Sequence, residues 1–451
     1  MIAVKQFHNF TDWSVDKILF SKEFQSCFTM ETLANIIKPR RERIKPPDVP
    51  KNRKIVSKIR FADGKVSFND RVIKNDMYKS CINDLLVSNI NFEKGAFAVN
   101  IWGDVYASTD YTSYIINLDK IIPEYLQVTL RSKTFLQHIA SVKPKGMKTR
   151  ARYEFIRDFS IPLPSILEQQ KLLNEYNRLL SATTLLKNKA EDEMICQLIN
   201  IQKDVSAYSK PTFSEKRESL LNIIHFTSAN RWEVDYIYKS GTIDSVIESF
   251  KHPAKSIEKL QKESLFGLSV KASPEQKDDM IPMLRMANIK NGEIHYNELK
   301  YLPYEYAVTD KESEKWLLQK GDFLITRTNG SKHLVGKAAV FDSNDIYTYA
   351  SYLIRYRFDT EIVLPEYVSI MFMTPIVREQ IAVLRRQSGG QYNLNSDEIN
   401  SIRIPVPADI QVQRDIIQRF QDSLAESKKF KKQANDTINN ANEYLEISLY
   451  R

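Results

Sequence analysis

Two loops rich in basic and amide side chains are the part of this sequence best suited to binding a charged partner. The first, "VKPKGMKTRARYEF", begins at Val142 and carries Lys143, Lys145, Lys148, Arg150 and Arg152 around a glycine. The second, "VLRRQSGGQYNLNSDEI", begins at Val383 and carries Arg385, Arg386, Gln387, Gln391, Asn393 and Asn395. Basic side chains neutralise phosphates, and Arg, Gln and Asn can read base edges through paired hydrogen bonds. These loops therefore predict contact with DNA.

A third candidate segment, "TRTNGSKH", follows a run of residues typical of a β-strand. It carries Arg327, Asn329, Ser331, Lys332 and His333. The matching place in the first half of the chain, "VSNINFEKG", is far less basic. Charged loops also serve simply for solubility, so each loop alone is ambiguous. Two basic loops at equivalent positions, and a third that differs between the halves, favour two sites that read different base sequences.

The composition is that of a globular protein with a basic balance. The chain has 451 residues, a hydrophobic content of 42% and a formal net charge of +9. This length allows two or three domains with sizeable cores. The positive charge favours a polyanionic partner, although many basic proteins bind none.

Cysteine, histidine and hydropathy patterns exclude several classes of site. The three cysteines are far apart and odd in number, which predicts neither a disulfide framework nor a thiolate zinc site. The six histidines form no close pair of the kind that metal sites use. No apolar run approaches the roughly 20 residues that cross a bilayer. We therefore expect no metal site and no membrane span, and a soluble, cytoplasmic protein.

Each segment that resembles an enzyme motif matches it only in part. "GSKHLVGKAA" resembles a phosphate-binding loop, but it has one residue too many between its glycines, and Ala338 stands where Ser or Thr would hold magnesium. "PEQK", at Pro274, resembles part of a nuclease cluster but lacks a second acidic strand segment at useful spacing. No Asn-Pro-Pro-aromatic motif of amino-methyltransferases is present. The sequence therefore predicts no catalytic residue.

The segments that would position the basic loops occur twice in the sequence. "IPLPSILEQQKLL" begins at Ile161 and "IPVPADIQVQRDII" begins at Ile404. Further matches lie before these two segments and occur in the same order in both halves. They are Trp13 with Trp232, Asp63 with Asn291, Asn83 with Gly321, Ser113 with Ser351, and Pro123 with Pro365. Such repetition predicts an internal duplication.

The repeated segment predicts an extended strand that turns into a helix. Pro162 and Pro164 hold the chain extended before the turn. Ser165 and Glu168 then form a Ser-x-x-Glu capping box. In the second copy Asp409 is the expected N-cap, but a valine replaces the glutamate and the box is incomplete.

Each repeated segment, which we call the Pro-rich join, leads into a long helix. One face of that helix carries a seam of apolar or small residues. The first seam comprises Leu172, Tyr176, Leu179, Thr183, Leu186, Ala190 and Leu198. The second comprises Ile417, Phe420, Leu424, Ala434, Ile438, Ala441 and Leu445. Steps of three and four residues describe a face for a partner helix, so we expect the two helices to pair. The alternative is that each helix packs only on its own domain.

The predicted fold is therefore α+β, with two similar mixed α/β domains, each followed by a long helix. The expected boundaries are residues 1–164 for the first domain, 165–209 for its helix, 210–407 for the second domain and 408–451 for the final helix.

With these motifs in place, the whole chain resembles the specificity subunit of a type I restriction–modification system. The segments that most resemble the family are Ile161 to Gln170, Gly321 to Val340 and Pro405 to Gln413. The resemblance implies two target-recognition domains, each reading one half of a split DNA target. It also implies an antiparallel coiled coil of the two helices, which sets the spacer between the half-sites and docks other subunits.

The resemblance further implies a chain without catalysis or cofactor of its own. Its expected partners are double-stranded DNA, two modification subunits that use S-adenosylmethionine to methylate adenine, and restriction subunits that use ATP and magnesium. Alternatives remain open: a nuclease or methyltransferase with drifted motifs, a coiled-coil adaptor without a DNA role, or a recognition subunit of another modification system.

Overall fold

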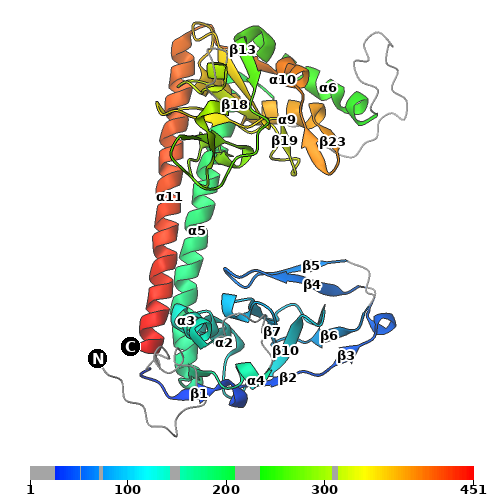
Figure 1. Ribbon diagram of the computed structural model, residues 1–451, viewed down its shortest axis with the longest axis vertical. Coiled ribbons are helices and arrows are strands. Elements are labelled where there is room, and N and C mark those ends of the chain that lie inside the picture. The colour runs from blue at the N-terminus through cyan, green and yellow to red at the C-terminus, as the bar shows by residue number, and fades with distance from the viewer. Residues whose placement is uncertain (1–25, 51, 71–74, 143–152, 209–233, 307–312) are drawn as a thin grey trace. The chain divides into compact units, whose positions relative to one another are not determined.

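A computed structural model describes residues 26–50, 52–70, 75–142, 153–208, 234–306 and 313–451 (Figure 1). The chain forms two compact units. Unit 1 comprises residues 1–187 and 431–451, and unit 2 comprises residues 188–430. Both long helices contribute to both units, whereas the sequence-based boundaries treat each helix as a separate segment and stay a prediction. The Trp13 and Trp232 motifs begin outside the described residues.

Unit 1 is built on a four-stranded antiparallel sheet with the order β2-β10-β7-β8. Its strands are Ile37–Pro39, Tyr111–Ile116, Leu85–Ser88 and Phe97–Val99 in that order. Helices α2 (Pro123–Leu130) and α3 (Lys133–Val142) share one apolar core with it. A five-stranded sheet, β3-β6-β9-β4-β5, comprises Arg43–Ile44, Met77–Ser80, Val105–Ala107, Lys54–Ile59 and Val66–Asn69.

Short elements complete unit 1. Strands β1 (Met30–Thr32) and β11 (Ser160–Pro162) pair antiparallel beside the start of the long helix. The remaining short helices are η2 (Leu33–Asn35), η3 (Pro46–Asp48), η4 (Phe92–Lys94) and α4 (Tyr153–Ile156).

Unit 2 repeats this plan. Its four-stranded antiparallel sheet has the order β13-β22-β18-β20. The strands are Gln261–Phe266, Leu353–Phe358, Phe323–Thr326 and Ala338–Val340. Helices α8 (Pro365–Met371) and α9 (Pro375–Leu384) share its core, and β12 (Ala254–Ser256) pairs with β25 (Arg403–Pro405).

The rest of unit 2 comprises three small sheets and several helices. The sheet β17-β14-β21 comprises Lys300–Pro303, Met280–Leu284 and Thr348–Tyr349. Strands β15 (Ile289–Lys290) and β16 (Glu293–Ile294) form a hairpin. The third sheet, β19-β24-β23, comprises Thr328–Asn329, Gln391–Asn393 and Arg386–Ser388. The helices are α6 (Val234–Glu248), α7 (Ile257–Leu260), α10 (Ser396–Ser401), η6 (Met286–Asn288), η7 (Tyr304–Tyr306) and η8 (Ser313–Trp316).

Each unit has a buried aspartate, paired with an arginine, at the start of equivalent strands; the two arginines differ in place, since Arg40 follows β2 and Arg357 lies in β22. In unit 1 the Asp84 carboxylate accepts from Arg40 Nε at 2.6 Å, just before β7. In unit 2 the Asp322 carboxylate accepts from Arg357 Nε at 2.6 Å, just before β18. Both aspartates are 2% exposed, so each buried charge depends on its arginine partner. Matching sheets and helices confirm the predicted duplication.

The long helices begin where the sequence predicts. Helix α5 spans Ile166–Val205 and α11 spans Ile410–Tyr450. The capping box of α5 forms, because the Glu168 carboxylate accepts from the Ser165 backbone N–H at 2.9 Å. At α11 the Asp409 carboxylate accepts from the Gln411 N–H at 2.8 Å, which confirms Asp409 as the N-cap.

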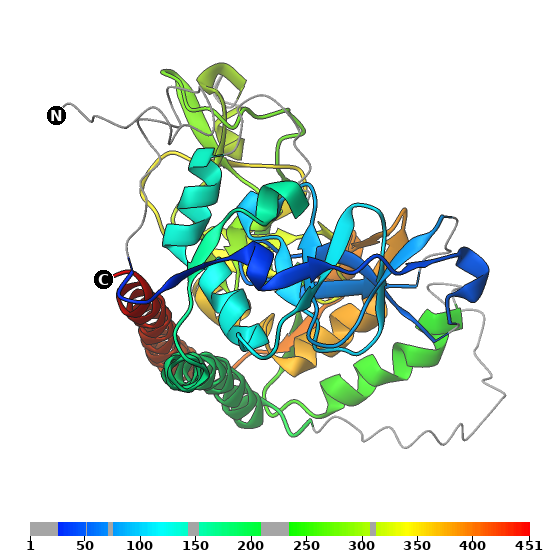
Figure 2. The same cartoon turned by 90° about the horizontal axis from the view of Figure 1, so that it is seen from below.

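Helices α5 and α11 pack antiparallel within each unit (Figures 1 and 2). In unit 1, Leu173 shares a core with Leu445 and Leu449. In unit 2, the Ser427 hydroxyl donates to the Ala190 carbonyl at 2.7 Å. The predicted pairing of the helices is therefore confirmed, although Leu173 and Ile416 are the buried residues where Leu172 and Ile417 were expected.

A buried glutamine fixes each long helix to its unit. The Gln169 amide accepts from the Ile122 N–H at 2.8 Å and donates to the Pro164 and Lys120 carbonyls. This amide thereby joins the first turn of α5 to the loop before α2 and to the Pro-rich join.

Gln413 makes the same three bonds in unit 2, accepting from Leu364 N–H at 2.9 Å and donating to the Ile362 and Pro407 carbonyls. Both glutamine residues are fully buried, so every bond replaces one lost to water. The join is repeated because each helix needs this attachment.

We expect Gln413→Ala to loosen the attachment of α11 locally. The substitution leaves the Leu364 N–H without its acceptor, at a cost of about 1–3 kcal/mol for a buried group. Hydrogen exchange at Leu364 should accelerate about tenfold or more. The matched control is Gln411→Ala, whose side chain is exposed and bonds only within α11. Equal exchange in both variants would show that the amide does not hold the join.

Candidate nucleic-acid interface

The predicted binding residues divide into a part that the structure describes and a part that it does not. Lys143, Lys145, Lys148, Arg150 and Arg152 lie outside the described residues. The two other segments, residues 327–333 and 385–393, both belong to unit 2 and are described in full.

The structure brings these two segments together in one small sheet. Strand β24 pairs antiparallel with β23 on one side and with β19 on the other (Figure 1). Asn393 thus lies opposite both Thr328 and Arg386. Pairing between strands far apart in sequence cannot be read from either segment alone. Two separate candidate loops are therefore one surface, which we call the β19-β24-β23 sheet.

A glycine pair makes the tip of this sheet. Gly389 and Gly390 connect β23 to β24 with φ angles of 57° and 76°. Positive φ at both central residues is the requirement of the two-residue hairpin turn that fits twisted strands. A Cβ added to either glycine would meet no atom within 4 Å, so the tip is open. The exposed side chains of Gln387 and Gln391 flank this tip.

Alternation along the strands divides the candidate residues between two faces. Cross-strand neighbours share a face, so Arg386, Asn393 and Thr328 lie on one side. Gln387, Tyr392 and Asn329 lie on the other. The sequence alone groups them together, and the strand pairing separates them.

Arg386 is tied to the protein itself. Its Nε donates to the Glu398 carboxylate, which also accepts from the Asn395 N–H at 2.9 Å. Asn395 in turn accepts from the Glu398 N–H at 2.7 Å and so caps α10. Arg386 and Asn395 therefore have structural partners that hold the hairpin against α10. The Asn393 carbonyl oxygen is likewise engaged, by the Thr328 hydroxyl at 2.8 Å.

Cationic side chains lie next to the β19-β24-β23 sheet and contact the loop after β19. The Arg385 guanidinium lies over the Tyr392 ring at 5.7 Å and donates to the Lys332 carbonyl. Arg378 donates to the carbonyls of His333, Val335 and Gly336, which shape the loop after β19. Burial, and then the charge of Arg385, lower the pKa of Arg378 to about 10, so it still carries its charge near neutral pH. The result is a positive potential beneath the loop.

Arg327 has an aromatic setting that the sequence analysis missed. Its guanidinium lies over the Phe266 ring, 5.1 Å from the centroid. Its backbone N–H donates to the Tyr352 carbonyl at 3.0 Å. Phe266 is 41% exposed and Tyr352 is 51% exposed, which is unusual for large aromatic residues. Phe266 ends β13 and Tyr352 directly precedes β22, so both lie far from Arg327 in the sequence and no local pattern links them to it.

Within the described part of the chain, no group of three or more His, Cys, Asp or Glu side chains could hold a metal ion. In the same residues no single helix is long and apolar enough to span a membrane. One bent pair, α8 with α9, passes that test by length and composition alone, as core helices also do.

Comparison with known proteins gives this surface a context. The sequence model of the type I restriction modification DNA specificity domain matches residues 264–440, which include the whole β19-β24-β23 sheet. Residues 264–440 are thus similar to the DNA specificity domain of type I restriction–modification systems. The predicted resemblance to this family's specificity subunits is thereby confirmed.

Two relatives of this chain are similar to it over part of their length. The specificity subunit of the EcoKI type I restriction enzyme of Escherichia coli K12 is 27% identical over 263 residues, 54% of this chain and 55% of that protein. The StySPI specificity subunit of Salmonella potsdam is 23% identical over 326 residues, 71% of this chain and 63% of that protein. The chain thus spans between about half and two thirds of the length of these curated relatives.

A solved structure shares the fold over nearly the whole chain. A chain from a study of complex assembly and conformational transition of the type I R-M system aligns with a TM-score of 0.52 and 13% identity. The alignment covers 93% of this chain and 97% of that one. The α+β prediction is confirmed.

The tie between the hairpin and α10 has a testable consequence. Glu398→Ala removes the carboxylate that accepts from the Asn395 N–H and from Arg386, and leaves the Asn395 cap of α10 in place; the lost hydrogen bond to Asn395 alone costs about 1 kcal/mol. Trypsin should then cleave after Arg386 about fivefold faster, because the hairpin opens more often. Asp397→Ala is the control, since this exposed neighbour makes no hydrogen bond or ion pair with a described residue. Unchanged cleavage in Glu398→Ala would show that the hairpin is held by its strand pairing alone.

Proposed function

We propose that this chain is the sequence-specific DNA-recognition subunit of a type I restriction–modification complex and is itself non-catalytic. In this proposal each unit reads one half of a bipartite DNA target. The partners are double-stranded DNA, two modification subunits and restriction subunits. S-adenosylmethionine, ATP and magnesium would be bound by those partners and not by this chain.

The observation that carries the proposal is the β19-β24-β23 sheet. It joins two segments that each carry side chains able to read bases, and it lies wholly inside the matched specificity domain. A two-stranded ribbon fits the major groove of DNA, where Arg, Gln and Asn form paired hydrogen bonds with base edges. The exposed tip offers Gln387 and Gln391 for that purpose.

The residues around the sheet suit a division between reading and positioning. The Arg327 guanidinium makes no hydrogen bond or ion pair with a described residue, and Phe266 limits its orientation. An arginine held in one plane suits the two acceptors of a guanine edge. Arg385, Lys332 and Arg378 would contribute the attraction to phosphates. Arg386 would support the hairpin through Glu398 and not read bases.

The duplicated plan supports one half-site for each unit. The loops of the two units differ although their sheets, buried aspartates and joins agree. Under the proposal, the paired helices would then set the number of unspecified base pairs between the half-sites.

We expect Gln387→Ala or Arg327→Ala to relax recognition at one half-site only. Loss of a direct reader costs about 1–3 kcal/mol of discrimination at its base pair. The measurement is binding of the assembled methyltransferase complex to a library of targets with single base changes. Gln319→Ala, an exposed glutamine of unit 2 outside the sheet, is the control. Unchanged preference at every position in both variants would reject the sheet as a reader.

A further inference from the structure

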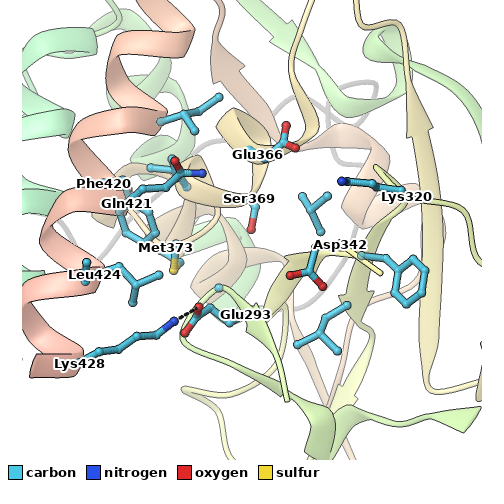
Figure 3. A pocket seen from close by; sticks show the side chains of 17 residues that line it. Glu293, Lys320, Asp342, Glu366, Ser369, Met373, Phe420, Gln421, Leu424 and Lys428 are labelled. Carbon is cyan, nitrogen blue, oxygen red and sulfur yellow. Dashed lines mark hydrogen bonds and ion pairs between the residues drawn. The ribbon is translucent and has the colours of Figure 1, made fainter. Parts of the chain in front are cut away.

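Unit 2 contains a cavity of about 430 Å³ between α8, α11, the β15-β16 hairpin and the end of β20 (Figure 3). Ile370, Met373, Phe420 and Leu424 belong to its apolar lining. Its polar side chains are those of Glu293, Lys320, Asp342, Glu366, Ser369, Gln421 and Lys428. The volume lies within the range of about 300–1,000 Å³ typical of ligand sites.

In unit 1 an arginine lies beside the turn that is equivalent to the β15-β16 turn. Arg131, which follows α2, donates to the Gly95 carbonyl at 2.7 Å and to the Phe61 carbonyl. Met373 follows α8 at the matching position. The turn glycines confirm the match: a Cβ on Gly64 would lie 2.9 Å from Arg131 Nη1, and a Cβ on Gly292 would lie 2.6 Å from Met373 Cε. Beside this turn, unit 2 therefore has the apolar Met373 side chain where unit 1 has the Arg131 guanidinium.

Unit 2 also has a shorter side chain than unit 1 at a second position beside the cavity. In unit 1 the Gln127 side chain accepts from the Val99 N–H at 2.6 Å. Ser369 stands at the matching position of α8, and its shorter side chain leaves space. Ser369 is 4% exposed, yet its Oγ has no hydrogen-bond partner among the described residues. A buried hydroxyl without a partner is costly unless a ligand or water meets it. Figure 3 shows this hydroxyl directed into the cavity.

A carboxylate that accepts a side-chain hydrogen bond in unit 1 accepts none from the matching residue in unit 2. In unit 1 the Glu124 carboxylate accepts from the Asn177 amide at 3.0 Å. The matching pair is Glu366 and Gln421, and no hydrogen bond joins them. Glu366 makes no hydrogen bond or ion pair with any residue that the structure describes. The cavity thus offers a free carboxylate, a free hydroxyl and an apolar floor.

The charges around the cavity favour a cation. Glu293 is paired with Lys428, and Asp342 accepts from the Tyr296 hydroxyl. Glu366, Asp342 and Glu293 outnumber Lys320 and Lys428 in a chain whose net charge is +9. With Glu293 paired to Lys428, an anion such as a DNA phosphate would meet the Glu366 and Asp342 carboxylates against the single ammonium of Lys320, so this cavity does not belong to the proposed DNA surface.

We propose that this cavity binds an arginine side chain of a partner protein. The guanidinium would pair with Glu366 and donate to Ser369 Oγ, and the aliphatic stem would lie on Met373, Phe420 and Leu424. In unit 1 the matching Glu124 and Gln127 side chains are already engaged by Asn177 and by the Val99 N–H, so the site is specific to unit 2. The proposal goes beyond DNA recognition and does not depend on it.

The test is a titration of the full chain followed by NMR of the Met373 methyl group, which lines the cavity. The probe is Nα-acetyl-arginine amide, and Nα-acetyl-citrulline amide is its uncharged counterpart of nearly equal shape. We expect a saturable shift of the Met373 signal with the arginine compound, and at least tenfold weaker binding of the citrulline compound. Ion pairs with hydrogen bonds are stronger than neutral ones, which sets this direction.

Matched variants separate binding from folding. Glu366→Gln should weaken the arginine compound about tenfold, whereas Glu124→Gln, at the occupied position of unit 1, should leave the affinity unchanged. Ser369→Gln, which introduces the unit 1 side chain, should abolish the shift while the other methionine signals stay in place. DNA binding should be the same in all three variants, so failure here is distinct from failure of the proposed function.

Three results would overturn the proposal. One is no saturable shift of Met373 with the arginine compound. Another is equal binding of the citrulline compound or of Nα-acetyl-norleucine amide, which would show an apolar groove without charge selectivity. The third is equal loss of binding in Glu366→Gln and Glu124→Gln.

Discussion

The attachment of each long helix to its unit through one buried glutamine is the constraint on which the rest of the structure depends. A helix start leaves backbone N–H groups without partners, and the loop before α2 or α8 has unpaired groups of its own. Gln169 and Gln413 join these in the same geometry, with three hydrogen bonds each. Because both amides are fully buried, the helix cannot change direction without breaking them. A recognition surface on the unit therefore moves together with its helix.

Much of the fold could be predicted from the sequence because its signals are local. The Pro-rich joins, the Asp409 cap and the helical seams each depend on neighbouring residues, and the structure has all three. The capping pattern at Glu168 is less informative. That glutamate caps an exposed helix start, whereas its neighbour Gln169 carries the attachment. The change to Val412 in the second copy therefore affects a cap and leaves the joint intact. Which of the two adjacent polar residues is buried depends on tertiary packing.

The candidate site was predictable in composition but not in arrangement. Arg and amide residues can be selected by type, yet the pairing of Thr328 with Asn393 joins strands 65 positions apart and has no local signal. Likewise, Arg386 has the residue type of a base reader, but Glu398 holds it. The aromatic setting of Arg327 has no local sequence signal because Phe266 belongs to another strand, β13, far from Arg327 in the chain. The cavity in unit 2 emerges only when the two copies are compared side chain by side chain.

The most direct measurement changes the helices and leaves both units intact. Four residues are inserted in α5 after Lys187 and four in α11 after Phe430, the positions where the units divide. Each insertion adds about one turn, or about 6 Å, and keeps the facing seams nearly in register. Methylated adenines are then mapped across the genome of cells carrying the altered chain with its partner subunits. We expect the same two half-sites with about two more unspecified base pairs between them, since DNA rises about 3.4 Å per base pair. An active complex with the original spacing, or with altered half-sites, would contradict the role of the helices as a rigid spacer.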